Sequence, residues 1–225
     1  MAMQWLEGEL RKTGNKQDEL FAKQIGIIRE FRGDIPLPVA SVEAPKVEVA
    51  RFSPEAREVL EAKGFKVYEL TGQSITSLRE QGKQFWSTWH RDYPDFESLT
   101  SRHSEVAIDP KKLFIPRSNN KTLQEQLEAV AKYSESLGVQ GVEAVLGEVP
   151  DYTELAFAHL DKTGQRLFGK KYDFNYTRTQ TRVGGDVAFV GRFHADDGLH
   201  VYYWFPDSRD GLLHAAPLVV PTGTK

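Results

Sequence analysis

The sequence predicts an α+β fold with one main domain, in which a helical first part is followed by antiparallel strands at the C-terminal end. Three observations support this prediction. Capped helical segments recur up to residue 164, an alternating strand pattern begins at residue 172, and no internal repeat is present. Because the strands follow the helices instead of alternating with them, the order favours α+β over a doubly wound parallel sheet.

Composition argues against several classes of protein. The chain has 225 residues, of which 40% are apolar, enough for one good core or two small ones. Its net charge of −3 argues against binding to nucleic acid by bulk charge, and the lack of cysteine excludes disulfides and thiol chemistry. No apolar run approaches the roughly 18 to 20 residues of a membrane span, and the N-terminus lacks the apolar centre of a secretory signal. We therefore expect a cytoplasmic protein or export by an unrecognised route.

The first fifty residues are expected to form a separate segment. Residues 1–32 carry apolar side chains at mostly helical spacing and contain no proline, which indicates a helix or a helix pair. Pro36, Pro38 and Pro45 then forbid a helix and favour extended chain. We expect a helical segment and Pro-rich linker over residues 1–50, and the main domain over residues 51–225.

Two short helices and a strand are expected to open the main domain. Ser53 and Pro54 form an N-cap with proline at the first helical position, and Gly64 is a stop signal. The run FKVYEL then predicts a strand, and the stretch from Ser74 to Gly82 repeats the pattern of cap and stop. The following FWSTWHRDYPDF is rich in aromatic residues. We favour a core cluster there over a ligand platform, because large aromatic side chains dominate core burial.

Two longer helices and four strands complete the expected fold. Residues 121–137 place leucine and valine on one side and are followed by Gly138, while Asp151 and Glu154 have the spacing of a capping box that opens a helix ending near Gly164. From residue 172 onward the runs YDFNYTRTQTRV, DVAFVGRF, GLHVYYWF and HAAPLVV predict strands separated by Gly, Asp and Pro turns.

The segment HADDGLH is the strongest candidate for a metal site. It places His194, Asp196 and His200 close together, and two imidazoles with a carboxylate could bind a divalent ion. The spacing matches no established metal motif, and Asp-Asp-Gly between two strands is a turn sequence. We therefore predict no metal and no cofactor, and keep a metal-dependent hydrolase as an alternative.

Other chemical patterns are weaker. The chain lacks a GxSxG elbow, a P-loop and a GxGxxG motif. His90 near Asp92 and Asp95, and His103 near Ser101 and Glu105, are candidate acid–base pairs, although such loop histidines are usually inert.

A second alternative is a nucleic-acid-binding accessory protein. Arg178, Arg182 and Arg192 lie among aromatic residues in one stretch, and single-stranded nucleic acid is bound by such mixtures. Asp173 and Asp186 in the same stretch weaken this interpretation. We therefore expect no nucleic-acid partner, and we expect that the protein is not an enzyme.

The C-terminal residues have an anomalous composition. Lys, Glu, Gln and Met occur 46 times over residues 1–182 and not once over residues 183–224. Strand and turn preferences explain part of this gap. A genetic explanation fits the rest. If both adenines of an asparagine codon are replaced at random, the codon still ends in C or T. Such codons cannot encode Lys, Glu, Gln, Met or Trp. Trp204 would then be a fixed scaffold residue.

The stretch GLHVYYWFPDSRDGLLHAAPLVVP resembles the end of the variable proteins of diversity-generating retroelements, in which a Trp precedes a short Asp/Arg/Gly-rich loop and a closing apolar strand. The resemblance covers residues 186–221. It implies a C-type lectin fold of the formylglycine-generating-enzyme type and a non-enzymatic binding function on a diversified C-terminal surface. The chain lacks the EPN, QPD and WND motifs, so calcium-dependent sugar binding is not implied.

The resemblance also implies a binding patch for a ligand that we expect to be a protein. In a strand, alternate side chains point to opposite faces, so Leu199 and Val201 are expected to anchor the core while His200 and Tyr202 face outward. Trp204 is expected to close the underside, and the oligomeric state stays open. The expected ligand-binding residues are Phe189, Arg192, His194, His200, Tyr202, Tyr203, Phe205, Ser208, Arg209, Asp210, Leu212 and His214.

Overall fold

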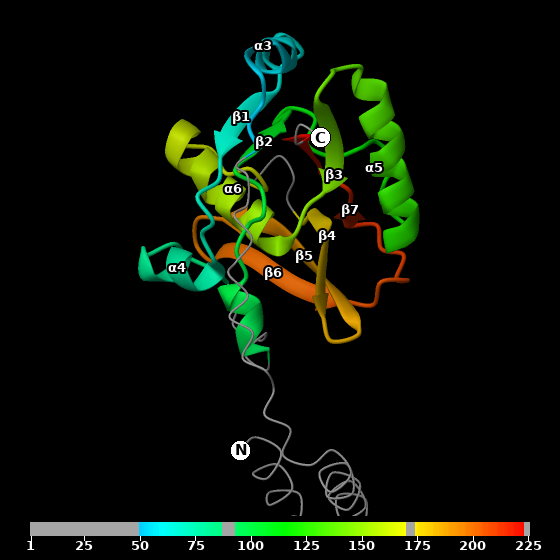
Figure 1. The fold of residues 1–225 in the computed structure, drawn as a ribbon. Helices are drawn as coiled ribbons and strands as arrows, with labels where there is room; N and C mark the ends of the chain where they lie inside the picture. Colours follow the sequence, from blue (N-terminus) through cyan, green and yellow to red (C-terminus); the bar gives the residue numbers. More distant parts are fainter. Residues whose placement is uncertain (1–49, 87–92, 170–173, 223–225) are drawn as a thin grey trace, which may run out of the picture. The chain divides into compact units, whose positions relative to one another are not determined.

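Two four-stranded sheets organise the described part of the chain (Figure 1). The computed structural model describes residues 50–86, 93–169 and 174–222, which all belong to one unit, Val47–Lys225. The expected N-terminal helix and Pro-rich linker, as well as His90 and Trp89, lie outside the described residues.

The first sheet joins strands that lie far apart in the sequence. It consists of β1 (Lys66–Glu69), β2 (Glu105–Ile108), β3 (Val142–Leu146) and β8 (Pro217–Pro221). Their order is β1-β2-β8-β3, and each neighbouring pair is antiparallel. The C-terminal strand β8 is therefore central, with Val219 opposite Ala107 on one side and Ala144 on the other.

Most of the expected helices are confirmed, and their ends follow the capping residues. The described helices are α3 (Pro54–Ala62), α4 (Ile75–Glu80), α5 (Leu123–Leu137), α6 (Val149–Thr163) and the 3₁₀ helix η2 (Pro94–Ser98). The side chains of Ser53, Ser74 and Thr122 each accept a backbone N–H of the first turn. Gly138 and Gly164 end α5 and α6 in the left-handed conformation that favours glycine.

The start of α6 corrects one expectation. Glu148 is its N-cap and Asp151 is the third helical residue, whose carboxylate accepts the Glu148 N–H at 2.7 Å. Asp151 and Glu154 are therefore not a capping pair. The Glu154 carboxylate instead accepts the backbone N–H groups of Thr71 and Gln73, which join α6 to the loop after β1.

The second sheet carries the candidate site. It consists of β4 (Tyr176–Val183), β5 (Asp186–His194), β6 (Gly198–Trp204) and β7 (Leu213–His214), in the order β6-β5-β4-β7. Neighbours are antiparallel except β4 and β7, which are parallel. The first expected strand begins later than predicted, at Tyr176 instead of Tyr172. Gly184 and Gly185 form the expected turn between β4 and β5.

The core lies on both faces of the first sheet. One cluster joins α6, including Tyr152 and Leu155, to one face of that sheet and to Val190 and Val201 of the second sheet. The other cluster packs α3 and α5 against the opposite face, around Val219. The inner face of the second sheet is thus covered by protein, and the pocket described below is lined by residues of its strands.

The α+β class is confirmed, but the expected separation of helices from strands is incomplete. The strands β2 and β3 fall between helices and were not expected. The aromatic-rich stretch is only partly a core cluster, because Phe85 and Phe96 are buried while Trp86 and Tyr93 are exposed. Among the described helices, none has both the length and the apolar character needed to cross a membrane.

Candidate aromatic binding site

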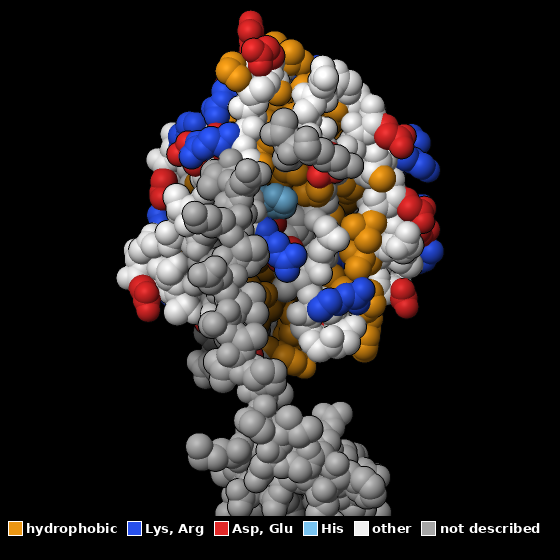
Figure 2. Space-filling model, in the orientation of Figure 1, with side chains coloured by type: hydrophobic (Ala, Val, Ile, Leu, Met, Phe, Trp, Pro, Cys, Tyr) orange, Lys and Arg blue, Asp and Glu red, His pale blue; other side chains and the backbone are white. Residues whose placement is uncertain are grey.

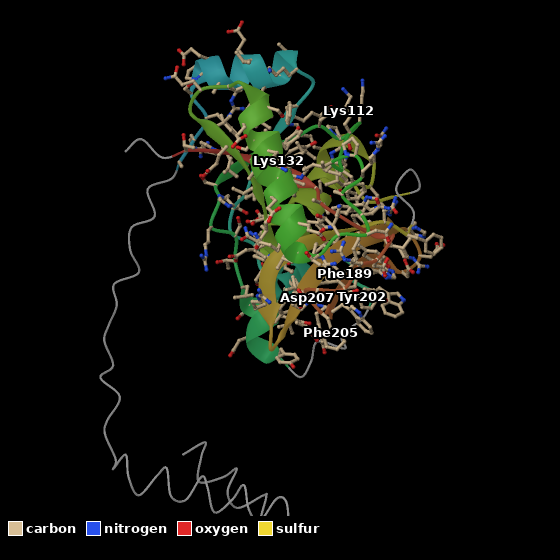
Figure 3. All side chains as sticks on the ribbon, turned by 90° about the vertical axis from the view of Figure 1, so that its right-hand side faces the viewer. Lys112, Lys132, Phe189, Tyr202, Phe205 and Asp207 are labelled. Carbon is tan, nitrogen blue, oxygen red and sulfur yellow. The ribbon has the colours of Figure 1, made fainter. Side chains whose placement is uncertain are left out.

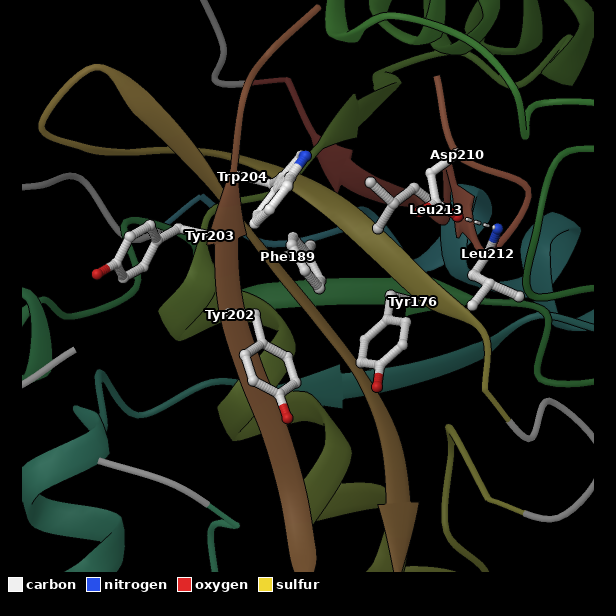
Figure 4. A pocket seen from close by; sticks show the side chains of 8 residues that line it. All are labelled: Tyr176, Phe189, Tyr202, Tyr203, Trp204, Asp210, Leu212 and Leu213. Carbon is white, nitrogen blue, oxygen red and sulfur yellow. Dashed lines mark hydrogen bonds between the residues drawn. The ribbon is translucent and has the colours of Figure 1, made fainter. Parts of the chain in front are cut away.

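A pocket of about 450 Å³ opens on the outer face of the second sheet (Figure 4). Alternation along β6 places Tyr202 and Trp204 on this face, and the strand register sets Phe189 opposite Tyr202. Tyr176 of β4 stands opposite Leu213 of β7. The pocket is lined by Tyr176, Phe189, Tyr202, Tyr203, Trp204, Asp210, Leu212 and Leu213.

Three of the rings form a continuous aromatic floor. The ring centroids of Tyr176 and Phe189 are 5.2 Å apart, those of Phe189 and Tyr202 are 5.7 Å apart, and those of Tyr176 and Tyr202 are 6.1 Å apart. These distances are typical of favourable aromatic pairs. Burial raises the pKa of the Tyr202 hydroxyl to about 12, so that it stays neutral at physiological pH.

A glycine makes room for this floor. Gly191 stands between Tyr176 and His200 in the strand register. A Cβ atom at Gly191 would lie 2.6 Å from the Cα atom of Tyr176 and 2.4 Å from the Asn175 carbonyl oxygen. Only glycine therefore lets β4 and the Tyr176 ring approach β5 this closely.

Arg178 fastens the loop that forms the other wall. Its side chain is 1% exposed, and its guanidinium donates to the carbonyl oxygens of Phe205, Pro206 and Ser208, the last at 2.7 Å. It also donates to the Gln126 amide oxygen at 3.1 Å. Burial lowers the pKa of Arg178, and the carboxylates of Asp207 and Asp210 oppose that shift. The loop is thus held by a buried cation.

A second tie joins the loop to α5. Arg209 donates to the carbonyl oxygen of Asn120 and lies 2.9 Å from the Glu125 carboxylate. Because Glu125 also caps the start of α5, the wall of the pocket and the helix end share one carboxylate. Figure 3 shows Phe189, Tyr202, Phe205 and Asp207 in the same part of the side view, away from Lys112.

The expected binding residues do not form one surface. Phe189, Tyr202, Tyr203, Asp210 and Leu212 line the pocket. Three other expected residues belong to the loop beside the pocket and form its rim: Phe205, Ser208 and Arg209. Arg192, His194 and His200 lie near the turn between β5 and β6. His214 lies apart from both groups and stacks on Phe114, with ring centroids 4.8 Å apart.

His200 was expected to be exposed on the outward face as a binding residue, and this expectation is wrong. The predicted alternation holds, because Leu199 and Val201 are buried on the inner face. However, the Trp86 N–H donates to the Leu199 carbonyl oxygen, so the segment after α4 runs along β6. The Trp86 ring stacks on the His200 ring with centroids 4.9 Å apart and 12° between their planes. This cover leaves His200 only 1% exposed.

Two other side chains differ from expectation. Trp204 does not close the underside of the sheet but is 53% exposed on the outer face, where it also contacts Phe205. Tyr203 cannot share a face with Tyr202, because consecutive strand residues point to opposite sides. Tyr203 borders the pocket, but its ring points away from the space in Figure 4 and packs against Tyr93, with centroids 5.7 Å apart.

The turn between β5 and β6 holds a small polar cluster. The Nε2 atom of His200 lies 3.1 Å from the Asp197 carboxylate, which also lies 3.9 Å from Arg192. Burial lowers the pKa of His200, and Asp197 partly opposes the shift. Across the described ranges, no group of three His, Cys, Asp or Glu side chains is placed to hold a metal ion. His194, Asp196 and His200 are thus not gathered as the alternative hydrolase site requires.

The other candidate patterns have structural partners. Glu105, proposed beside His103, is buried and binds Arg57 at 2.6 Å. Ser101 accepts the His103 backbone N–H and donates to Asp151. Arg178 is buried beneath the loop, so it is not available to the basic surface that the nucleic-acid interpretation requires.

Sequence reasoning missed three residues that line the pocket: Tyr176, Trp204 and Leu213. The alternation that placed Tyr202 outward also applies to Trp204 and was a usable signal. No local pattern pairs β4 with β7, so the position of Leu213 could not be found in this way.

Comparison of the chain with models of known protein families, with curated proteins and with solved structures finds no match.

Proposed function

We propose that this chain is a ligand-binding protein that recognises its partner through the aromatic pocket and its rim. The main observation is a group of exposed large apolar side chains at the pocket: Trp204 is 53% exposed, Phe205 62% and Leu212 45%. Exposed apolar patches with a polar border mark interaction sites. Figure 2 shows hydrophobic side chains reaching the surface in the lower half of the described unit.

The chemistry of the site suits binding. Pockets of this size, lined by aromatic side chains with few polar groups, are typical ligand sites. Tyr, Trp and Phe provide rigid contact area at a small entropy cost, which is why they dominate binding hot spots. The loop wall is fastened from beneath by Arg178, so little ordering is required when a ligand binds. The partner is a protein in this proposal, and an exposed side chain of that protein enters the pocket.

The proposal includes the finer identity that the sequence suggests. The chain would be a variable protein of a diversity-generating retroelement with a C-type lectin-like fold. Two observations support this idea: the unusual composition of residues 183–224, and the position of Phe189, Tyr202 and Leu212, within that stretch, in the pocket. The neighbouring DNA tests it. A near-copy of the coding segment for residues 186–221, differing at adenines and lying beside a reverse transcriptase, is expected; absence of both would refute the identity.

Binding itself is tested with apolar aromatic probes. We expect indole and p-cresol to give saturation-transfer NMR signals with the full chain, and Trp204→Ala to reduce these signals at least several-fold. Phe174→Ala is the matched control, because Phe174 is 50% exposed but lies outside the pocket. Equal signals from both variants, or no signal from the unchanged chain, would contradict binding at the pocket.

A further inference from the structure

The aromatic pocket contains one charged wall residue. Four rings surround the space in Figure 4, those of Tyr176, Phe189, Tyr202 and Trp204. Among the described residues that line the pocket, Asp210 alone carries a charged side chain. Its Oδ1 atom accepts the Leu212 backbone N–H at 2.7 Å, which fixes the carboxylate on the wall.

Two arginines near this carboxylate have partners of their own. Arg178 stands beside Phe189 in the strand register and interacts with the Asp210 charge, while its guanidinium donates to carbonyl oxygens of the loop. Arg209 is paired with Glu125. Neither side chain lines the pocket. The space between Trp204 and Asp210 therefore combines aromatic rings with a negative charge and presents no cation of its own.

Resting on the proposed function, we infer that the pocket takes an organic cation whose charge is covered by alkyl groups, such as a quaternary or trimethylated ammonium. Aromatic rings attract cations through their negative faces, and the carboxylate adds a second attraction. A primary ammonium or a guanidinium must also satisfy three to five N–H donors, which a mostly apolar wall does not provide. A quaternary ammonium has no such donors, so it fits this wall better.

The test compares choline with 3,3-dimethylbutan-1-ol, which has the same shape and no charge. We expect isothermal titration calorimetry with the full chain to show choline binding about tenfold more tightly than the neutral alcohol. Asp210→Asn removes the charge and keeps an oxygen that can accept the Leu212 N–H. It should weaken choline binding about three- to tenfold and leave binding of the alcohol unchanged.

Two further variants make the result specific. Asp207→Asn makes the same change of charge in the same loop outside the pocket lining, and it should alter choline binding less than twofold. Trp204→Leu keeps an apolar side chain but removes the ring, so it should weaken binding of choline more than that of the alcohol.

The outcomes separate this inference from the proposed function. If choline and the alcohol bind equally, and Asp210→Asn changes neither, the pocket binds ligands but does not select cations. Choline binding that is insensitive to both Asp210→Asn and Trp204→Leu would place the cation elsewhere and overturn the inference. Absence of choline binding at millimolar concentration would also overturn it, while the indole and p-cresol experiment would still decide whether the pocket binds ligands.

Discussion

Arg178 shows how one buried side chain shapes the surface above it. Its guanidinium satisfies carbonyl oxygens of a loop that has little regular structure of its own. A backbone carbonyl buried without a partner costs about 1–3 kcal/mol. The loop can therefore vary in its exposed side chains as long as the arginine holds its backbone.

Replacement of Arg178 should be costly. We expect Arg178→Met to lower the free energy of unfolding by about 3 kcal/mol or more, because several buried acceptors lose their donor at once. Chemical denaturation measures the change. Arg182→Met is the matched control on the same strand, and it should stay within about 0.5 kcal/mol because Arg182 is exposed. Similar losses in both variants would contradict the role assigned to Arg178.

The expected binding residues should differ in how well they tolerate substitution. Phe205→Ala removes an exposed ring and should change the free energy of unfolding by less than about 0.5 kcal/mol. His200→Ala removes a buried ring beneath Trp86 and should lower it by about 2 kcal/mol. Thermal and urea unfolding of both variants provide the measurement. A neutral His200→Ala would mean that Trp86 does not cover this position in solution.

At the scale of elements, local signals located several helix ends. Ser53 and Ser74 cap helices as expected, because their hydroxyls satisfy backbone N–H groups within the same turn. Thr122 caps α5 in the same way, although no cap was predicted there. The Asp151 and Glu154 spacing misled because the Glu154 carboxylate serves a loop far away in the sequence. A spacing rule cannot distinguish a local partner from a distant one.

The start of α5 offers a test of capping next to the site. Thr122→Ala should lower the free energy of unfolding by about 1 kcal/mol, because the Glu125 N–H loses its acceptor. Thr122→Ser restores the hydroxyl and should recover most of the loss. The urea concentrations at the unfolding midpoint are compared between the variants, with the slope of free energy against urea concentration held constant. Equal losses in the two variants would show that the methyl group, and not the cap, carries the effect.

The short strands β2 and β3 show the limit of local patterns. The run EVAI is only four residues long and buried on both faces, so it lacks the alternation that identifies a half-buried strand. Its partners are β1 and the distant β8. Strand formation there depends on long-range pairing, which propensity alone does not encode.

At the scale of the whole molecule, the central position of β8 links the candidate site to the core. Residues 217–221 are buried between β2 and β3, while Asp210 and Leu212 of the preceding loop line the pocket. The order of helices and strands predicted the α+β class, and alternation along the strand predicted that Tyr202 lies on the outer face. The sequence did not predict that Trp86 covers His200, since the two residues are 114 positions apart in the chain.

Two buried histidines, His159 and His200, and the half-buried His214 make the stability of the molecule depend on pH. Burial is the largest cause that lowers the pKa values of His159, His200 and His214. The unfolded chain, with pKa values near 6.5, therefore takes up protons at a higher pH than the folded chain. Above about pH 6.5 these histidines are neutral in both states and do not lower the free energy of unfolding. As the pH drops below about 6.5, the free energy of unfolding falls by at most about 1.4 kcal/mol per pH unit for each histidine.

Urea unfolding at pH 7.5, 6.5 and 5.5 measures this dependence above the range in which carboxylates titrate. We expect the free energy of unfolding to be lower at pH 5.5 than at pH 7.5. His214→Phe keeps a ring against Phe114 but cannot take up a proton, so it should make the decrease smaller. A free energy of unfolding that is constant across the three pH values would show that the buried histidines titrate alike in the folded and unfolded chains.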